Sequence, residues 1–171
     1  YRIPLWPVAE RDSRGVGSYS AAGIPVLDVH ELAAGKLTAL FARTSGRDLF
    51  DAHRLLTQIN LDVQKLRLGF IAYGAMNRLD WRSVSIEDVA FEERELVDQL
   101  LPMLRRDESR DEAVDAEWAA RMLDETREAL AALLPFTSAE HKFLDRLLDR
   151  GEIDASLLTE DAALQARIEA Q

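Results

Sequence analysis

The sequence has 171 residues, 47% of them hydrophobic and 30% charged, a balance typical of a folded globular domain rather than a disordered chain. It contains no run of about 18 apolar residues, which excludes a membrane-spanning helix, and no cysteine, which excludes a disulfide scaffold and a thiolate zinc site. The formal net charge of −10 is uneven, because residues 1–80 carry ten Lys and Arg against eight Asp and Glu, whereas residues 81–171 carry eleven against twenty-three. An acidic surface repels phosphate, so we expect any contact with a nucleotide or RNA in the first half of the chain. We also expect a cytoplasmic protein without a membrane partner.

The N-terminal end carries the β content that the sequence predicts. Residues 1–8 indicate an extended segment, because their two prolines suit a sheet edge or a loop. Residues 11–23 are rich in Gly and Ser and indicate a loop. The apolar run 24–27 follows and predicts a short strand.

From residue 28 onward the apolar spacing is mostly helical. Leu and aromatic residues recur three or four positions apart, which predicts helices over residues 28–43, 48–59, 63–78, 92–105, 111–134, 139–150 and 160–170. Residues 81–91 are ambiguous between a helix and a brief strand at 84–86. The expected fold class is therefore mainly α with a small β contribution at the N-terminal end.

Capping residues mark the expected helix boundaries. Asp28 and Glu31 have the spacing of a capping box, in which each side chain binds the backbone N–H of the other residue. Ser138 and Thr159 are the expected N-caps of the last two helices, and Gly151 is the expected stop between them.

The residues with the clearest chemistry lie on the first two predicted helices. Lys36 stands in mid-helix among small residues, and Arg43 follows seven positions later on the same face. Arg47, Asp48 and Asp51 can share one face of the next helix, because they are three and four positions apart. A short turn between the helices predicts a tight hairpin, in which the lysine and the aspartates can face one cleft. Cations and carboxylates at such a place suit phosphate chemistry.

Ordinary structural roles explain the same residues equally well. Asp48 can be the N-cap of its helix. Arg47 and Asp51 can form an ion pair on one helix, which contributes about 0.3–0.5 kcal/mol. Lys36 can be a surface lysine. Spacing alone does not decide between these roles and a phosphate site.

The same residues resemble the nucleotidyltransferase AbiEii/AbiGii toxin family. The resemblance rests on Glu-Leu-Ala-Ala-Gly-Lys at 31–36, Ala-Leu at 39–40, Arg43 and Arg-Asp-Leu-Phe-Asp at 47–51. It extends to the C-terminal part through segments at 135–136, 140–144 and 151–158. The resemblance therefore covers nearly the whole chain.

The resemblance implies the toxin of a type IV toxin–antitoxin or abortive-infection system with a DNA polymerase β-like fold. Such a protein transfers a nucleotide from an NTP to an acceptor such as RNA or a tRNA end, uses Mg²⁺ and has a cognate antitoxin. In the family a Gly-Ser-like turn before an Asp-x-Asp strand binds the metal ions. This sequence has Gly17-Ser18 but no Asp-x-Asp after it, so we expect that motif upstream of Tyr1 and a fragment that is inactive alone.

The resemblance also implies roles for individual residues. Lys36 is expected to bind the NTP phosphates together with Arg43, and Lys36 and Asp51 are the expected catalytic residues. Arg47 and Asp48 are expected to support the helix hairpin, and no metal ligand is expected within this fragment. On this interpretation, residues 1–60 are the remainder of the nucleotidyltransferase lobe and residues 61–171 are a helical C-terminal region.

Two alternatives remain open at the level of sequence. Arg47 and His53 match the loose Arg-x(4–6)-His spacing of HEPN ribonucleases, which cleave RNA without metal. The chain can also be a non-catalytic helical module that binds a protein partner through its acidic C-terminal helices. His30, His53 and His141 are not spaced as metal ligands on one helix.

Overall fold

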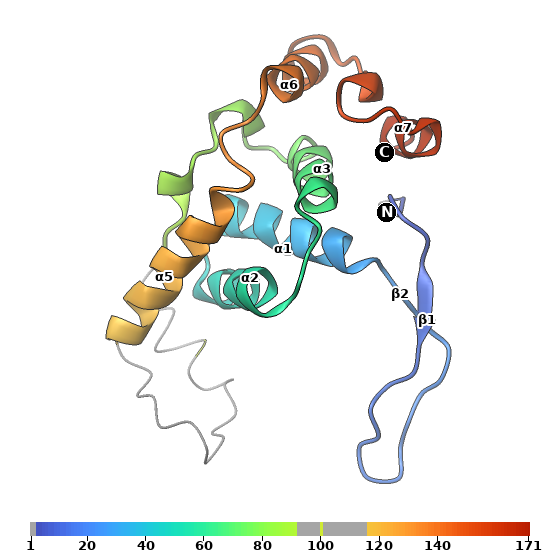
Figure 1. The fold of residues 1–171 in the computed structure, drawn as a ribbon, viewed down its shortest axis with the longest axis vertical. Helices are drawn as coiled ribbons and strands as arrows, with labels where there is room; N and C mark the ends of the chain where they lie inside the picture. The colour runs from blue at the N-terminus through green and yellow to red at the C-terminus, as the bar shows by residue number, and fades with distance from the viewer. Residues whose placement is uncertain (1–2, 92–99, 101–115) are drawn as a thin grey trace.

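The computed structural model describes residues 3–91, residue 100 and residues 116–171, and the statements below concern these residues. Six α-helices and a two-stranded sheet are present among them (Figure 1). The helices are α1 (Val29–Arg43), α2 (Gly46–Gln58), α3 (Val63–Gly74), α5 (Ala116–Leu130), α6 (Ser138–Arg150) and α7 (Ala162–Glu169). The mainly helical class predicted from the sequence is therefore confirmed. None of the described helices combines the length and apolar character needed to cross a membrane.

The sheet is an antiparallel hairpin of β1 (Ala9–Arg11) and β2 (Ile24–Val26), in which Ala9 pairs with Val26 and Arg11 with Ile24. It projects from the helical body as a two-stranded arm (Figure 1). The prediction of a strand at 24–27 is confirmed within one residue. Its partner strand β1 was not predicted, because its three residues are all exposed and carry no apolar alternation.

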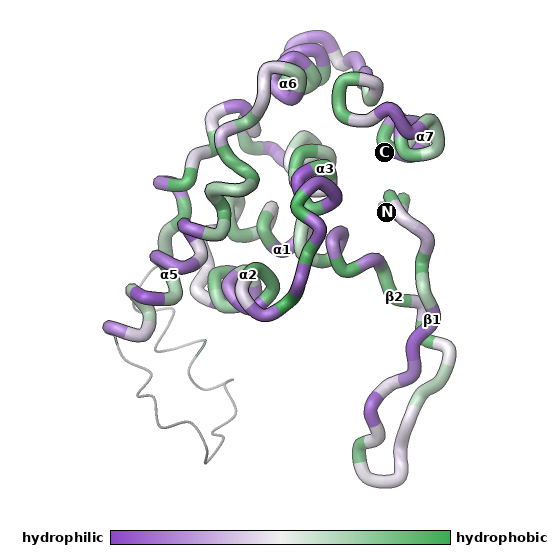
Figure 2. Tube along the Cα trace, in the orientation of Figure 1, coloured by the Kyte–Doolittle hydropathy of each residue, from purple (hydrophilic) through white to green (hydrophobic). Residues whose placement is uncertain are grey.

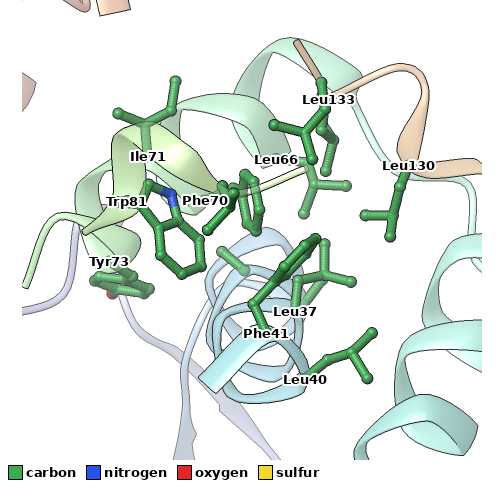
Figure 3. Packing of buried hydrophobic residues seen from close by; sticks show 14 of the residues in the cluster. Leu37, Leu40, Phe41, Leu66, Phe70, Ile71, Tyr73, Trp81, Leu130 and Leu133 are labelled. Carbon is green, nitrogen blue, oxygen red and sulfur yellow. The ribbon is translucent and has the colours of Figure 1, made fainter. Parts of the chain in front are cut away.

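Helix α1 lies at the centre of the molecule. It packs against α3 on one side and α2 on another, and α2 packs in turn against α5 (Figure 1). The side chains between α1 and α3 form the heart of the core (Figure 3). The fully buried side chains of the core as a whole come from α2 and α5 as well as from α1 and α3, and they include Leu37, Leu40, Leu49, Phe70, Ile71, Trp81 and Leu130. Figure 2 shows hydrophilic and hydrophobic residues alternating along α5, as expected for a helix with one face on this core.

Three aromatic rings pack against one another in the core near the end of α3. The ring centroids of Phe41 and Phe70 lie 5.6 Å apart, and that of Trp81 lies 5.7 Å from Phe41 and 5.0 Å from Phe70. Trp81 packs so closely on Gly74 that a Cβ added there would lie 1.9 Å from the indole ring. The close approach of α3 to α1 occurs at Gly69, whose Cβ would lie 3.0 Å from the Cβ of Ala34.

Only one of the two hydrogen bonds predicted for the capping box at the start of α1 is formed. Asp28 is the N-cap, and its Oδ1 accepts a hydrogen bond of 2.8 Å from the N–H of His30. Glu31 does not return to Asp28, because its carboxylate accepts hydrogen bonds from the N–H groups of Leu5 and Trp6. The spacing of a capping box is thus present without its geometry.

The last two helices begin one or two residues away from the predicted positions. Thr137 is the N-cap of α6, one residue before Ser138, and forms a capping box with Glu140. Asp161 is the N-cap of α7, two residues after Thr159. Gly151 ends α6 as predicted, with a φ of 69°.

Other boundaries also shift. Helix α3 ends at Gly74 rather than near residue 78, and residues 81–91 contain two 3₁₀ turns, η1 (Trp81–Ser83) and η2 (Ile86–Asp88), instead of a strand at 84–86. A third 3₁₀ turn, η5 (Ala155–Leu157), precedes α7. The helix predicted over 92–105 lies outside the described residues except at residue 100. The helix predicted over 111–134 is described from residue 116 onward, where α5 ends at Leu130, four residues earlier than predicted.

Candidate functional site

Lys36 and Asp51 meet where α1 and α2 form a hairpin. Thr44 ends α1 with a φ of 50°, and Ser45 is already the N-cap of α2, so the two helices fold back on each other. Lys36 Nζ donates a hydrogen bond of 2.6 Å to Asp51 Oδ2. The two side chains remain 48% and 42% exposed, and such exposed pairs contribute about 0–1 kcal/mol. The pair therefore contributes little to folding, and both side chains remain accessible to solvent.

Arg43 forms a second cation–carboxylate pair between the same helices. Its Nε and Nη2 each donate a hydrogen bond of 3.0 Å to Asp48. Asp48 is 8% exposed at its side chain, whereas Arg43 is 63% exposed, so a buried carboxylate orients an exposed guanidinium. The interpretation of Asp48 as an N-cap is wrong, because α2 begins at Gly46 and Ser45 is its N-cap.

Both cations line one open groove, named here the Lys36 groove. It has a volume of about 330 Å³ and lies along one face of α1, with walls from the N-terminal segment, the end of β2 and α3. Lys36 and Arg43 are two helical turns apart on this face. The lining residues are Pro4, Leu27, Glu31, Leu32, Gly35, Lys36, Ala39, Arg43 and Tyr73.

The other predicted site residues on α2 have different surroundings. Arg47 is exposed, and no ion pair joins it to Asp51 in the described part of the chain, since Asp51 pairs with Lys36. His53 Nε2 lies 2.6 Å from Glu125 Oε2 and so joins α2 to α5. The structure brings Lys36 and Asp51 together, and Arg43 and Asp48 together, but it leaves Arg47 at the surface.

Sequence reasoning missed the environment of Glu31. This residue is 1% exposed, and its carboxylate accepts hydrogen bonds of 2.9 Å from Leu5 N and 3.1 Å from Trp6 N, with a further short one from the Tyr73 hydroxyl. Among the described residues no cation pairs with it. The only sequence signal was a glutamate three positions after an N-cap, which predicts a local contact rather than a contact 26 residues away.

His30 forms a second contact that the sequence did not predict, and this contact joins α1 to α3. Its Nδ1 lies 2.6 Å from Asp28 Oδ1, and its Nε2 accepts a hydrogen bond of 2.9 Å from the N–H of Asp62, the N-cap of α3. An imidazole that accepts at Nε2 and donates at Nδ1 is neutral. Burial disfavours the charged form of Asp28, but the hydrogen bonds from His30 outweigh it and hold the pKa of this carboxyl below its ordinary value. These contacts tie the start of α1 to the start of α3.

The described residues contain no ready-made cluster of metal-binding side chains. Mg²⁺ prefers carboxylate and water oxygens in an octahedral arrangement. Asp51 and Asp48 are each occupied by a cation of α1, and the described residues contain no group of three or more His, Asp or Glu side chains that can bind a metal.

The helix hairpin thus presents two cations to one groove, and each of them pairs with a carboxylate from the facing helix. The family model for the nucleotidyl transferase AbiEii toxin of type IV toxin–antitoxin systems matches residues 2–161. The chain therefore belongs to this family of nucleotidyltransferase toxins, as its motifs predicted, and the family implies a cognate antitoxin. No curated protein and no solved structure matches the chain. The family match favours the nucleotidyltransferase interpretation over the HEPN alternative for Arg47 and His53.

Proposed function

We propose that this chain provides the phosphate-binding face of a nucleotidyltransferase that moves a nucleotide from an NTP to an acceptor, in the first instance RNA or a tRNA end. The observation that carries the proposal is the position of Lys36. It lines a groove with Arg43, and its only described partner is an exposed carboxylate that a phosphate can replace. Family membership supports the use of an NTP. The DNA polymerase β-like fold and the use of Mg²⁺ belong to the proposal as well.

Lys36 and Arg43 have different tasks in this proposal. Lys36 is a mobile point charge that leaves Asp51 and neutralises phosphate oxygens, because phosphoryl transfer depends on positioning and charge stabilisation. Arg43 is held by Asp48 through one edge of its guanidinium, so its other edge can donate to a phosphate oxygen. The triphosphate then lies along α1 across two helical turns.

Asp51 becomes available when Lys36 binds phosphate. Its carboxylate loses its cation and can accept a hydrogen bond from the attacking hydroxyl group of the acceptor. Asp48 keeps its partner throughout, which makes it a supporting residue, and Arg47 stands exposed beside this pair. The division into a lobe at 1–60 and a helical region at 61–171 remains part of the proposal.

The test is the binding of inorganic tripolyphosphate and of the four NTPs, measured by isothermal titration calorimetry. Lys36→Ala is expected to weaken binding at least about tenfold, because a hydrogen bond to a charged group contributes about 1.5–3 kcal/mol and each 1.4 kcal/mol is tenfold. The unfolding temperature should barely change, since the Lys36–Asp51 pair is exposed.

Lys142→Ala is the matched control, because Lys142 is also an exposed lysine within a helix, α6. It removes the same charge from a face remote in the fold and should leave the affinity within about twofold of the unchanged protein. Equal affinity of the Lys36→Ala variant and the unchanged protein, or no binding by the unchanged protein, would refute the proposal.

A further inference from the structure

The N-terminal segment is held in place by a buried carboxylate rather than by a strand. Residues 4–6 lie outside the two-stranded sheet, so their backbone groups need other partners. Glu31 accepts from the N–H groups of Leu5 and Trp6, and Arg167 Nη1 donates a hydrogen bond of 2.9 Å to the carbonyl of Leu5. Leu5 is fully buried and Trp6 is 8% exposed. Glu31 thus sets where this segment lies against α1.

The same carboxylate positions a second wall of the Lys36 groove. The hydroxyl of Tyr73 on α3 donates to Glu31 Oε1, the oxygen that also accepts from Leu5. Pro4 and Tyr73 both line the groove, and so does Glu31 itself. Glu31 lies five positions before Lys36 on α1. Its side chain therefore connects two walls of the groove, one from the N-terminal segment and one from α3.

A buried carboxylate without a cation is costly for folding. Burial of a charge that is not paired with a cation is expensive, so stability alone does not account for this one. Its three hydrogen bonds come from neutral donors on two separate segments, which is what a geometric role requires. The groove that it shapes is the one with Lys36 and Arg43.

We propose that Glu31 is a positioning residue for triphosphate binding, which acts by fixing residues 4–6 and Tyr73 as the walls of the Lys36 groove. This inference rests on the proposed function, because it assigns the groove to the triphosphate of an NTP. Glu31 does not touch the phosphate in this account. Its loss opens the groove and lowers affinity, while Lys36 and Arg43 stay on an intact helix.

The experiment compares three variants by titration with inorganic tripolyphosphate, a probe that is independent of the base. Glu31→Gln retains Oε1 for Leu5 and Tyr73 but places an NH₂ group against the N–H of Trp6, and should weaken binding about fivefold. Tyr73→Phe removes only the hydroxyl and should weaken it about threefold. Glu31→Ala removes all three acceptors and should weaken it more than about tenfold. If Glu31→Ala does not fold, the two milder variants decide.

Glu140→Gln is the matched control for a purely structural effect. Glu140 is also a buried carboxylate with several hydrogen bonds, but it pairs with Arg67 and does not line the Lys36 groove. It should lower the unfolding temperature and leave the affinity within about twofold. Hydrogen exchange provides a second readout, because the amides of Leu5 and Trp6 should exchange faster in Glu31→Gln but not in Glu140→Gln.

The outcomes separate this inference from the proposed function. Weaker binding by Glu31→Gln and Tyr73→Phe at a temperature where both are folded supports the positioning role. Binding by both variants equal to that of the unchanged protein, while Lys36→Ala binds weakly, overturns the positioning role alone. Failure of the unchanged protein to bind tripolyphosphate, or equal binding by Lys36→Ala, overturns the proposed function and the positioning role with it.

Discussion

At the scale of single residues, buried charges in this protein serve as links between segments. Arg67 on α3 donates through Nε and Nη2 to Glu140 at 2.6 and 2.7 Å, and also to the carbonyls of Ala132 and Pro135. Burial disfavours the charged form of Glu140, but hydrogen bonds from Arg67 and Thr137 outweigh it and lower the pKa of Glu140 below its ordinary 4.5. This carboxylate therefore joins α3, the turn after α5 and the start of α6.

The lowered pKa of Glu140 leads to a pH-dependent stability. A carboxyl whose pKa is lower in the folded state adds stability above its unfolded pKa of 4.5, and this stability is lost as the pH falls through the folded pKa. Glu140→Gln should cost about 1.5–3 kcal/mol of unfolding free energy at neutral pH, and less at an acid pH below the unfolded value of 4.5. Urea unfolding of both proteins at the two pH values measures the difference. A difference that stays constant between these pH values would contradict the assignment.

At the scale of elements, α1 and α3 pack closely because small residues face each other. Ala34 is fully buried against Gly69, and Gly74 leaves the space that the indole of Trp81 fills. Trp81 is itself fully buried between Phe41 and Phe70. The end of α3 is therefore determined by aromatic packing as well as by hydrogen bonding, which explains why the helix stops before residue 78.

Substitution of these glycines tests the packing of α1 and α3. Gly74→Ala would place a methyl group 1.9 Å from the ring of Trp81, so either the indole or the helix must move, at a cost of about 3 kcal/mol or more. Gly69→Ala meets the Cβ of Ala34 at 3.0 Å and should cost clearly less. Thermal unfolding of both variants, with near-UV circular dichroism to follow the tryptophan, checks the order. If Gly69→Ala lowered the unfolding temperature as much as Gly74→Ala, or more, Trp81 would not restrict position 74.

At the scale of the whole molecule, the two ends of the chain meet beside the Lys36 groove. The points marked N and C lie near each other in Figure 1. The side chain of Gln171 accepts from the N–H of Ile3 and donates to its carbonyl, and Arg167 of α7 donates to the carbonyl of Leu5. Helix α7 therefore packs on the same segment that Glu31 holds from the other side. The segment separates two grooves, since Pro4 lines the Lys36 groove and Leu5, Trp6 and Pro7 line a second groove of about 570 Å³.

The chain as a whole is expected to bind a triphosphate without completing nucleotide transfer. Its sequence contains no Asp-x-Asp motif, and among the described residues no cluster of carboxylates is able to bind a metal. Incubation of purified residues 1–171 with labelled NTPs, Mg²⁺ and RNA should leave the RNA unlabelled. Incorporation that disappears in Lys36→Ala and Asp51→Ala would overturn this expectation and show that residues 1–171 suffice for catalysis.

Long apolar stripes made most of the helices predictable. The apolar spacing of α1, α2 and α6 gave their positions within one or two residues, because apolar residues recur in each at helical intervals. The short connection between α1 and α2 also predicted that Lys36 and Asp51 can face each other. The strand β1 was not predictable, because its residues pair only with β2 and bury nothing.

The partners of individual polar side chains were much harder to predict than the helices. Spacing predicted that Glu31 would cap α1 and allowed Asp51 to pair with Arg47, and both are local contacts. The structure instead pairs Glu31 with Leu5 and Asp51 with Lys36, 26 and 15 residues away. A carboxylate takes the donors that the fold brings to it, and a single sequence records only those donors that are its near neighbours.

The sequence by itself thus determined the helical class, the membership of a nucleotidyltransferase toxin family and the residue types available for phosphate binding, since all three depend on periodicity and local motifs. Only the tertiary structure decided which carboxylate faces which cation, and that a buried glutamate joins the N-terminal segment to α1. The physical reason is that apolar burial depends on the face of a helix, which local spacing reveals. The partner of a charged group depends on the packing of segments far apart in the chain.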